Sequence, residues 1–408
     1  MLRKALLIGL AGAMLVGLVA VAQEPVTIQF WHSMSSGHQP HLVALVDQFM
    51  AEYPYITVEL TYQGGYGDTE DKVNASVVAG TPPTIVQLYE NVITPLVEVL
   101  YPIGPHMTAA ERSDILTGLV ANNTFDGVLV SVPWNKSIMV LYYRSDLIDT
   151  PPTTWEEFAQ MAADLTVDLD GDGVIDQYGT GLRPYNPEMY LNYVVQNGGS
   201  ILNDDWTEVT IGEEEGLEAM QYAESLVPYS FISSGYLSDA LGAGQVAMFV
   251  DTSAGYYYNN KAAVENGYTM DVARVPFGPV NRRSAIQGTN LVVFDMGQTQ
   301  AQKDAAVLLA RFLIRPENTV YWSTRGGYLP VVKSAYSDPA WLDYLADHPE
   351  AVVMSEAMVD GFAQILHPNY GQMRSVLGSA FESVLLAAAT AEEAVADLVI
   401  ELEALLEY

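Results

Sequence analysis

The chain has 408 residues, of which 50 are acidic and 17 are lysine or arginine, so its formal net charge is −33. Such a charge argues against nucleic acid and anionic lipid as partners, because both repel a strongly negative surface. The sequence contains no cysteine, which excludes disulfides, thiolate metal sites, a cysteine nucleophile and a lipid-modified cysteine. The length allows a substantial core and favours two or more compact lobes.

The first 22 residues have the pattern of a secretory signal peptide. Arg3 and Lys4 supply the positive start, residues 5–19 form an apolar stretch, and residues 20–22 are a small-residue cleavage site. Because the apolar stretch is long for a signal, an uncleaved membrane anchor is the alternative. We expect cleavage and, since no cysteine is present to carry a lipid, a freely diffusing periplasmic protein that is not a lipoprotein.

Strand-like and helix-like patterns alternate from Val26 to about Ala285. This alternation is typical of α/β lobes, in which helices flank a mostly parallel sheet. The first predicted elements, in chain order, are a strand that begins at 28, a helix that ends at 49–54, a strand at 56–62, a glycine-rich loop at 64–66, a helix that ends at 78 and a strand at 85–90.

Two segments mark the expected crossings between lobes: residues 140–143, and a strand at 286–294 that returns to the first lobe. We therefore predict two lobes with a hinged cleft between them. The predicted boundaries are 1–22 for the signal peptide, 23–138 and 286–330 for lobe 1, and 139–285 and 331–408 for lobe 2.

Capping residues mark two later helix starts. Thr154 is followed by Glu157 three positions on, and Thr390 is followed by Glu393 in the same way. In this arrangement the hydroxyl accepts from a backbone N–H at the third position, which satisfies a group that the helix leaves free. The helix after Thr390 then carries one apolar stripe, formed by Val395, Leu398, Leu402 and Leu405.

Six short motifs in a fixed order carry a family resemblance. They are Phe30-Trp31-His32-Ser33-Met34, Gly64-Gly65-Tyr66, Gln87-Leu88-Tyr89-Glu90, Pro133-Trp134-Asn135-Lys136-Ser137, Gly327-Tyr328-Leu329-Pro330 and Gln372-Met373-Arg374. In this order they resemble the extracellular solute-binding proteins of ABC importers, and most of all the periplasmic members that bind glycerol-3-phosphate. The resemblance covers nearly the whole chain after the signal.

The resemblance implies a periplasmic-binding-protein-like fold whose two lobes close on a small molecule. Such a receptor delivers its ligand to permease subunits of an ABC transporter in the membrane, without catalysis and without a required cofactor. We expect a monomer that binds glycerol-3-phosphate or a glycerophosphodiester such as glycerophosphocholine. The acidic surface is then either a solubilising, salt-adapted surface or a docking face for a basic surface of the transporter.

The resemblance also assigns a ligand site, residue by residue. Tyr66 and Glu90 match positions at the glycerol end. Around the phosphate the matching residues are Ser137, Ser253, Gly288, Tyr328 and Arg374. The chemistry fits a phosphate, because a desolvated anion needs a guanidinium together with hydroxyl and amide donors.

Each of these residues also has a purely structural interpretation. The tyrosines Tyr66 and Tyr328 are typical of turns and rims, Glu90 of a solvated loop, and Arg374 of an ion pair with one of the many acids. Ser253 is the weakest match, and its neighbour Thr252 is an alternative donor.

The chain departs from the family where tryptophans pack on a choline head group. Around Gly181 the candidates that replace them are Tyr185, Tyr190 and Tyr193, which can form a cation–π wall. Arg183 in the same segment offers a second positive contact. The size of the accepted ligand is therefore open.

A separate acidic loop resembles the first part of an EF-hand calcium loop. Carboxylates at positions one, three, five and nine are Asp168, Asp170, Asp172 and Asp176. Position twelve is Gly179, where an EF-hand has a bidentate glutamate. The loop is interpreted either as a structural calcium site completed by a remote acid or as an acidic turn.

Two other functions are weighed against the glycerol phosphate receptor. A mono- or oligosaccharide receptor of a carbohydrate importer is favoured by the many tyrosines but has no need of Arg374. A secreted hydrolase would use two carboxylates or a metal centre. The sequence shows no nucleophile elbow, metal-binding cluster of histidine and aspartate or phosphate-binding loop, and we predict that the protein is not an enzyme.

Overall fold

The structure is a computed structural model that describes residues 23–35 and 37–406. The predicted signal peptide, residues 1–22, lies outside the described residues. Within the described ranges, no helix combines the length and the apolar character that a membrane span requires.

Strands from both lobes join in one path. Its order is β2 (Ile56–Tyr62), β1 (Val26–His32), β3 (Ile85–Leu88), β11 (Ser284–Val293), β6 (Val132–Arg144), β9 (Val246–Thr252), β7 (Tyr178–Leu182) and β8 (Ser230–Ile232). The outer strands pair in parallel, β1 with β2 and β3, and β7 with β8 and β9. Within this path the two crossing strands β6 and β11 run antiparallel to their neighbours, so the sheet is mixed, with parallel pairs on either side of an antiparallel centre.

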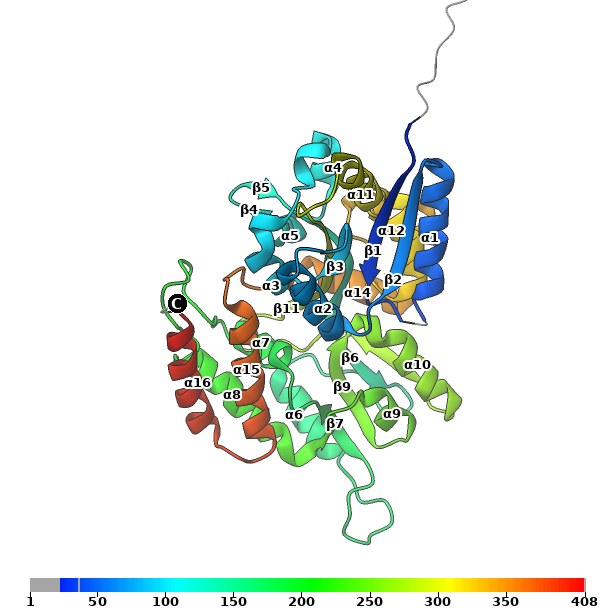
Figure 1. Cartoon of the computed structure of the whole chain (residues 1–408). Coiled ribbons are helices and arrows are strands. Elements are labelled where there is room, and N and C mark those ends of the chain that lie inside the picture. Colours follow the sequence, from blue (N-terminus) through cyan, green and yellow to red (C-terminus); the bar gives the residue numbers. More distant parts are fainter. Residues whose placement is uncertain (1–22, 36, 407–408) are drawn as a thin grey trace, which may run out of the picture.

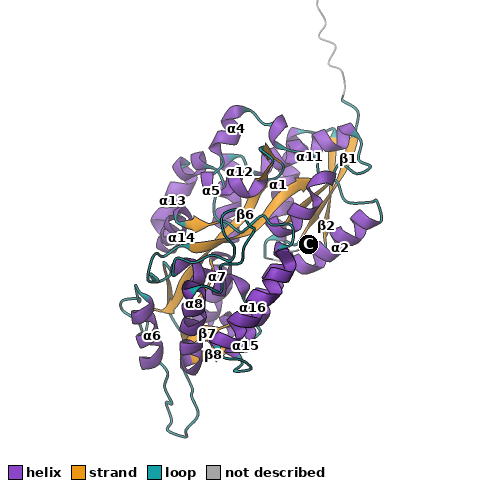
Figure 2. Cartoon of the chain, turned by 90° about the vertical axis from the view of Figure 1, so that its left-hand side faces the viewer, coloured by secondary structure: helices purple, strands orange, loops and turns teal. Residues whose placement is uncertain are grey.

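The helices cover both faces of these strands (Figures 1 and 2). Around the β1–β3 strands lie α1 (Gln39–Glu52), α2 (Tyr66–Val78), α3 (Glu90–Ile93), α4 (Ala109–Asp114), α5 (Thr117–Val120), α11 (Gln300–Leu313) and α12 (Pro316–Gly326). Around β7–β9 lie α6 (Trp155–Asp164), α7 (Pro187–Gln196), α8 (Glu214–Leu226), α9 (Leu237–Gly242) and α10 (Tyr256–Glu265). The remaining helices are α13 (Pro339–Asp347), α14 (Pro349–Val359), α15 (Tyr370–Leu385) and α16 (Ala391–Leu406).

Four short strands lie beside or apart from the main path. β10 (Met270–Ala273) pairs with β6, and β12 (Gly361–Phe362) pairs with β11. The strands β4 (Thr124–Phe125) and β5 (Val128–Leu129) form a small hairpin of their own.

The predicted helix starts are confirmed. The hydroxyl of Thr154 accepts from the N–H of Glu157 at 3.2 Å, where α6 begins. At the start of α16, Thr390 and Glu393 satisfy each other's backbone N–H groups at 3.2 and 3.1 Å. The predicted strand at 85–90 is shorter than expected: β3 ends at Leu88, and Glu90 begins α3.

The segment 331–408, predicted as one piece of lobe 2, is divided between the lobes. The helix α13 packs against α12 of lobe 1, while α15 and α16 pack against α7 and α8 of lobe 2. Trp341 on α13 is 1% exposed and belongs to the same hydrophobic cluster as Trp322 of α12. Burial of this large aromatic surface holds α13 to lobe 1, a contact that the sequence pattern does not reveal.

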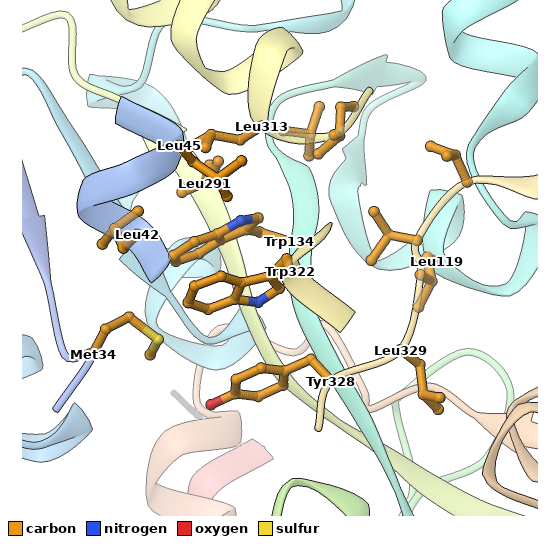
Figure 3. Packing of buried hydrophobic residues seen from close by; sticks show 14 of the residues in the cluster. Met34, Leu42, Leu45, Leu119, Trp134, Leu291, Leu313, Trp322, Tyr328 and Leu329 are labelled. Carbon is orange, nitrogen blue, oxygen red and sulfur yellow. The ribbon is translucent and has the colours of Figure 1, made fainter. Parts of the chain in front are cut away.

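An aromatic stack connects the core of lobe 1 to its surface. The rings of Trp134 and Trp322 lie 4.9 Å apart, and those of Trp322 and Tyr328 lie 5.8 Å apart and nearly parallel. Figure 3 shows the stack beside Met34 and Leu42, with the hydroxyl of Tyr328 at the end away from Trp134. Because its neighbours are wholly buried, Tyr328 is held on a rigid base.

Gly288 allows β11 to approach β6 closely. Its φ is +99°, and a Cβ at this position would lie 1.9 Å from the carbonyl oxygen of Asn135. No ordinary side chain fits there, since both the backbone conformation and the space favour glycine.

We expect Gly288→Ala to lower the free energy of unfolding by at least about 3 kcal/mol, because strain and overlap add. Gly297→Ala is the matched control: its φ is +95°, but a Cβ there would have open space around it. This control should lose only about 1–2 kcal/mol. Urea unfolding measures both variants, and equal losses would contradict the close approach.

Candidate functional site

A cleft between the lobes contains two adjoining pockets. The large pocket has a volume of about 510 Å³, and the small pocket a volume of about 360 Å³. The walls that they share come from both lobes and from β11, and are formed by Tyr66, Tyr89, Tyr236, Asp251, Thr252 and Gln287.

Hydroxyl groups and one amide form a network in the cleft wall. The hydroxyls of Tyr66 and Tyr328 are hydrogen-bonded at 3.0 Å, and the amide of Asn135 donates to Tyr66 at 3.1 Å. Thr289 in turn donates to the amide oxygen of Asn135. Burial raises the pKa of both tyrosines above its ordinary value, so both stay neutral donors. Because their hydroxyls touch, they do not lie at opposite ends of a ligand, as the assignment to glycerol and phosphate ends had implied.

Glu90 lies behind the cleft wall in a buried ion pair. Its Oε1 is 2.5 Å from Nζ of Lys136, and the two side chains are 6% and 0% exposed. Lys136 also donates to the carbonyl oxygen of Gly288 at 3.0 Å. Burial lowers the pKa of Lys136, while Glu90 raises it. Glu90 is absent from the described lining of both pockets, in contrast to the predicted contact with a polyol.

Sequence reasoning missed the role of Lys136. It lies in the middle of β6, a strand whose residues are almost all buried. A lysine in such a strand needs a carboxylate partner. That requirement was the available signal, and Glu90, at the end of the strand predicted at 85–90, was the acid to connect with it.

Ser137, Thr252 and Gly288 line the large pocket, whereas Ser253 does not. The hydroxyl of Thr252 donates to that of Ser137 at 2.8 Å. Ser253 is fully buried, and its hydroxyl accepts from the N–H of Ile138 at 3.2 Å. Thr252, which lines both pockets, therefore takes the place in the wall that the family match gave to Ser253.

Four charged side chains line the small pocket. They are Arg183, Glu188, Asp251 and Arg374. Arg374 on α15 binds Glu188 on α7, with 2.5 Å between Nε and Oε1. Burial alone would lower the pKa of Arg374, but Glu188 raises it above the ordinary value. Arg374 thus lines the pocket and also forms an ion pair. Both interpretations from the sequence, a ligand-binding arginine and a structural ion pair, therefore apply to it.

Asp251 and Arg183 face the same space from lobe 2. Burial raises the pKa of Asp251, against the opposing effects of the N–H of Thr252, which donates to it at 2.7 Å, and of Arg183. The guanidinium of Arg183 lies 5.0 Å from the ring centroid of Tyr236. An arginine over an aromatic ring remains able to bind an anion at its edge.

Of the three tyrosines that replace the family's tryptophans, Tyr185 alone is in the described lining of the two cleft pockets. Tyr190 is wholly buried, with its hydroxyl donating to the carbonyl of Gly216 at 3.0 Å. Tyr193 packs against the ring of Trp155 in the core of lobe 2. A wall of three tyrosines does not form in the cleft. Tyr236, 74% exposed and not foreseen from the sequence, lies beside Arg183 instead.

The acidic loop lies between α6 and β7, at the bottom of Figures 1 and 2 and away from the cleft. Asp168, Asp170 and Asp176 offer carboxylate oxygens within 4.8 Å of one another, and Asp172 is outside this group. The carboxylate of Asp168 also accepts from the N–H of Gly171 at 2.7 Å. The three carboxylates are close enough to share an ion, and the bonds within the loop also fit an acidic turn, so calcium stays a prediction.

The model of a family described as bacterial extracellular solute-binding protein matches residues 44–349. The sn-glycerol-3-phosphate-binding periplasmic protein UgpB of Escherichia coli K12 is 26% identical, over 94% of each chain. The same protein from Shigella flexneri is 25% identical, also over 94% of each chain. These matches confirm the family resemblance predicted from the six motifs.

Two solved structures share the fold. The GacH receptor of Streptomyces glaucescens, solved unliganded and with acarbose, has a TM-score of 0.83 at 20% identity and covers 94% of this chain and 99% of its own. UgpB from Mycobacterium tuberculosis, in complex with glycerophosphocholine, has a TM-score of 0.80 at 20% identity with the same coverage. The predicted α/β, periplasmic-binding-protein-like fold is thereby confirmed.

We expect Lys136→Met to cost about 3–5 kcal/mol of unfolding free energy, because it leaves Glu90 buried without a partner. The double variant Lys136→Met/Glu90→Gln should recover most of that loss. Lys261→Met is the control, since its pair with Glu265 is exposed and 3.9 Å long, and it should change stability by less than about 1 kcal/mol. Urea unfolding at neutral pH measures all three variants. If Lys136→Met lost less than about 1 kcal/mol of unfolding free energy, the buried ion pair between Lys136 and Glu90 would be refuted.

Calcium is expected to raise the unfolding temperature of the protein by about 5 °C at millimolar concentration, because an ion that binds only the folded state stabilises it. Asp168→Asn/Asp170→Asn should remove the effect, and Mg²⁺ at equal concentration is the control for ionic strength. Calorimetric melting is the measurement. Identical melting with either ion, in both proteins, would assign the loop as an acidic turn.

Proposed function

The chain belongs to the family of bacterial extracellular solute-binding proteins, the substrate-binding components of ABC importers, and we propose that its ligand is glycerol-3-phosphate or a glycerophosphodiester such as glycerophosphocholine. Proteins of this family bind solutes and are not enzymes, in agreement with the prediction from sequence.

The observation that carries the proposal is the position of Arg374. Its side chain is 36% exposed and lines the small pocket together with Arg183 and Thr252. Two guanidinium groups and a hydroxyl supply the donors that a phosphate needs when it leaves water. The curated relatives whose names specify sn-glycerol-3-phosphate add support through their 26% identity along almost the whole chain.

The remaining lining suits the uncharged part of such a ligand. The amide of Gln287 and the hydroxyl of Tyr66 lie on walls common to both pockets, and Ser137 lies in the large pocket. A ligand with its phosphate near Arg374 would direct its hydroxyl groups or head group toward the large pocket. The combined space exceeds that of a glycerol phosphate, which favours a diester with a head group beside Tyr236.

The second candidate is a mono- or oligosaccharide. The large pocket is lined by Tyr62, Tyr66, Tyr89, Tyr236, Tyr258 and Tyr328, and aromatic rings stack on the apolar faces of sugars. This alternative leaves Arg374 and Arg183 without a charged partner from the ligand, and for that reason it ranks second.

Closure of the lobes over the ligand is part of the proposal. The cleft walls come from both lobes, and only the crossing strands and neighbouring segments connect them, so a hinge motion can bring the walls together. The closed receptor would dock on permease subunits in the membrane after export to the periplasm by its signal peptide.

Isothermal titration with glycerophosphocholine, glycerol-3-phosphate and maltose tests the ligand class. We expect heat with at least one of the phosphates and a loss of about 10- to 100-fold in affinity in Arg374→Ala, the effect of removing a charged hydrogen-bond donor. Arg325→Ala is the control, because Arg325 is exposed on α12, outside the described cleft walls.

A circular dichroism melt establishes that each variant is folded. Binding of maltose alone would overturn the phosphate proposal in favour of the sugar receptor. Unchanged phosphate affinity in Arg374→Ala would remove Arg374 from the site.

A further inference from the structure

We propose that Glu188 determines the charge of the ligand: through its ion pair with Arg374, the cleft selects anions with a single negative charge over dianions. The inference rests on the proposed function and deepens it, since a phosphodiester carries one negative charge and a phosphomonoester carries two near neutral pH. It assigns Glu188 as a specificity-determining residue.

The ion pair occupies part of the guanidinium that a phosphate would use. Oε1 of Glu188 binds both Nε and Nη2 of Arg374. Nη1 is the guanidinium nitrogen of Arg374 left without a partner among the described residues. A ligand phosphate therefore meets an arginine of which one edge is already taken, and binds beside a carboxylate.

Glu188 is not free to swing away into water. It is 8% exposed and belongs to the first turn of α7. Its helix packs against α8, α15 and β11. A dianion that displaced it from Arg374 would leave a buried carboxylate unpaired, which is strongly unfavourable.

The charges around the small pocket are already balanced. The lining holds the cations Arg183 and Arg374 and the carboxylates Glu188 and Asp251. Glu70 on α2 is a further acid near Arg374: burial raises the pKa of Glu70, and Arg374 lowers it. A monoanion adds one negative charge to these groups, whereas a dianion adds two and is repelled more strongly by every carboxylate present.

The test compares glycerophosphoglycerol, a diester without a cationic head group, with glycerol-3-phosphate in the full-length mature protein and in Glu188→Gln. Glutamine keeps the shape and can still accept from Arg374, so it removes the charge alone. At pH 7.5 we expect the wild type to bind the diester at least about tenfold more tightly than the monoester. In Glu188→Gln the monoester should gain about tenfold, while the diester changes by less than about threefold.

Glu214→Gln is the matched control. Glu214 is exposed at the start of α8, so this variant removes the same charge from the surface, away from the described cleft lining. The ratio of the two affinities should stay at its wild-type value. A change as large as that of Glu188→Gln would mean that net charge, not this ion pair, sets the preference.

A pH series on the wild type needs no variant. The monoester takes up a proton near pH 6, whereas the diester does not titrate in this range. Lowering the pH from 7.5 to 5.5 should therefore raise the affinity of the monoester relative to the diester. The other charged or titratable groups that face Arg374 and the cleft are Arg183, Asp251, Glu70, Tyr89, Tyr370 and His38. They act more strongly on the dianion than on the monoanion, so a group that takes up a proton as the pH falls shifts the ratio of affinities in the same direction.

Each outcome decides the inference. Equal affinities for the two phosphates in the wild type, or a ratio unchanged in folded Glu188→Gln, would overturn the role of Glu188 while the proposed function stands. If Glu188→Gln does not fold, a ratio that stays flat with pH in the wild type overturns it. Binding of maltose and of neither phosphate overturns the proposed function and the inference together.

Discussion

The buried ion pair between Lys136 and Glu90 is the interaction on which the cleft depends. A lysine withdrawn from water is stable only with its charge matched and its N–H groups bonded, and here Glu90 and the carbonyl of Gly288 meet that demand. The pair joins the first residue of α3 to both crossing strands. It thereby fixes the backbone at the point where β6 leaves β11 and continues beside β9.

From that fixed point, tightly packed side chains hold the hydroxyl groups of the cleft wall in place. Asn135, next to Lys136 on β6, holds Tyr66, and Tyr66 holds Tyr328 at the end of the aromatic stack. The hydroxyl of Tyr66 is oriented by the fully buried Asn135, and that of Tyr328 by the half-buried Tyr66. Such preorganisation reduces the entropy that a ligand must lose on binding, and it keeps uncharged donors in the wall at every physiological pH.

The sequence predicted what depends on local pattern. The capping residues Thr154 and Thr390, the alternation of strands and helices and the family motifs all led to elements that exist. Contacts between distant segments had no local signal: Glu188 binds Arg374 across 186 positions, and Tyr66 meets Tyr328 across 262. In each case the contact became evident only from the burial of the side chains in the structure, because buried polar groups must have hydrogen-bond partners.

The charges of the small pocket bear on both proposed ligand classes, the sugar and the phosphate. A neutral sugar leaves the pair of Glu188 and Arg374 intact and binds through tyrosines and amides. A bound anion could use only the part of the Arg374 guanidinium that is not already bonded to Glu188. Two arginines held in a cleft of so acidic a protein are costly to maintain without an anionic ligand, since each needs a carboxylate partner or an aromatic face in its absence. Both arginines have such partners here, Glu188 and Tyr236, so the structure meets this requirement by itself.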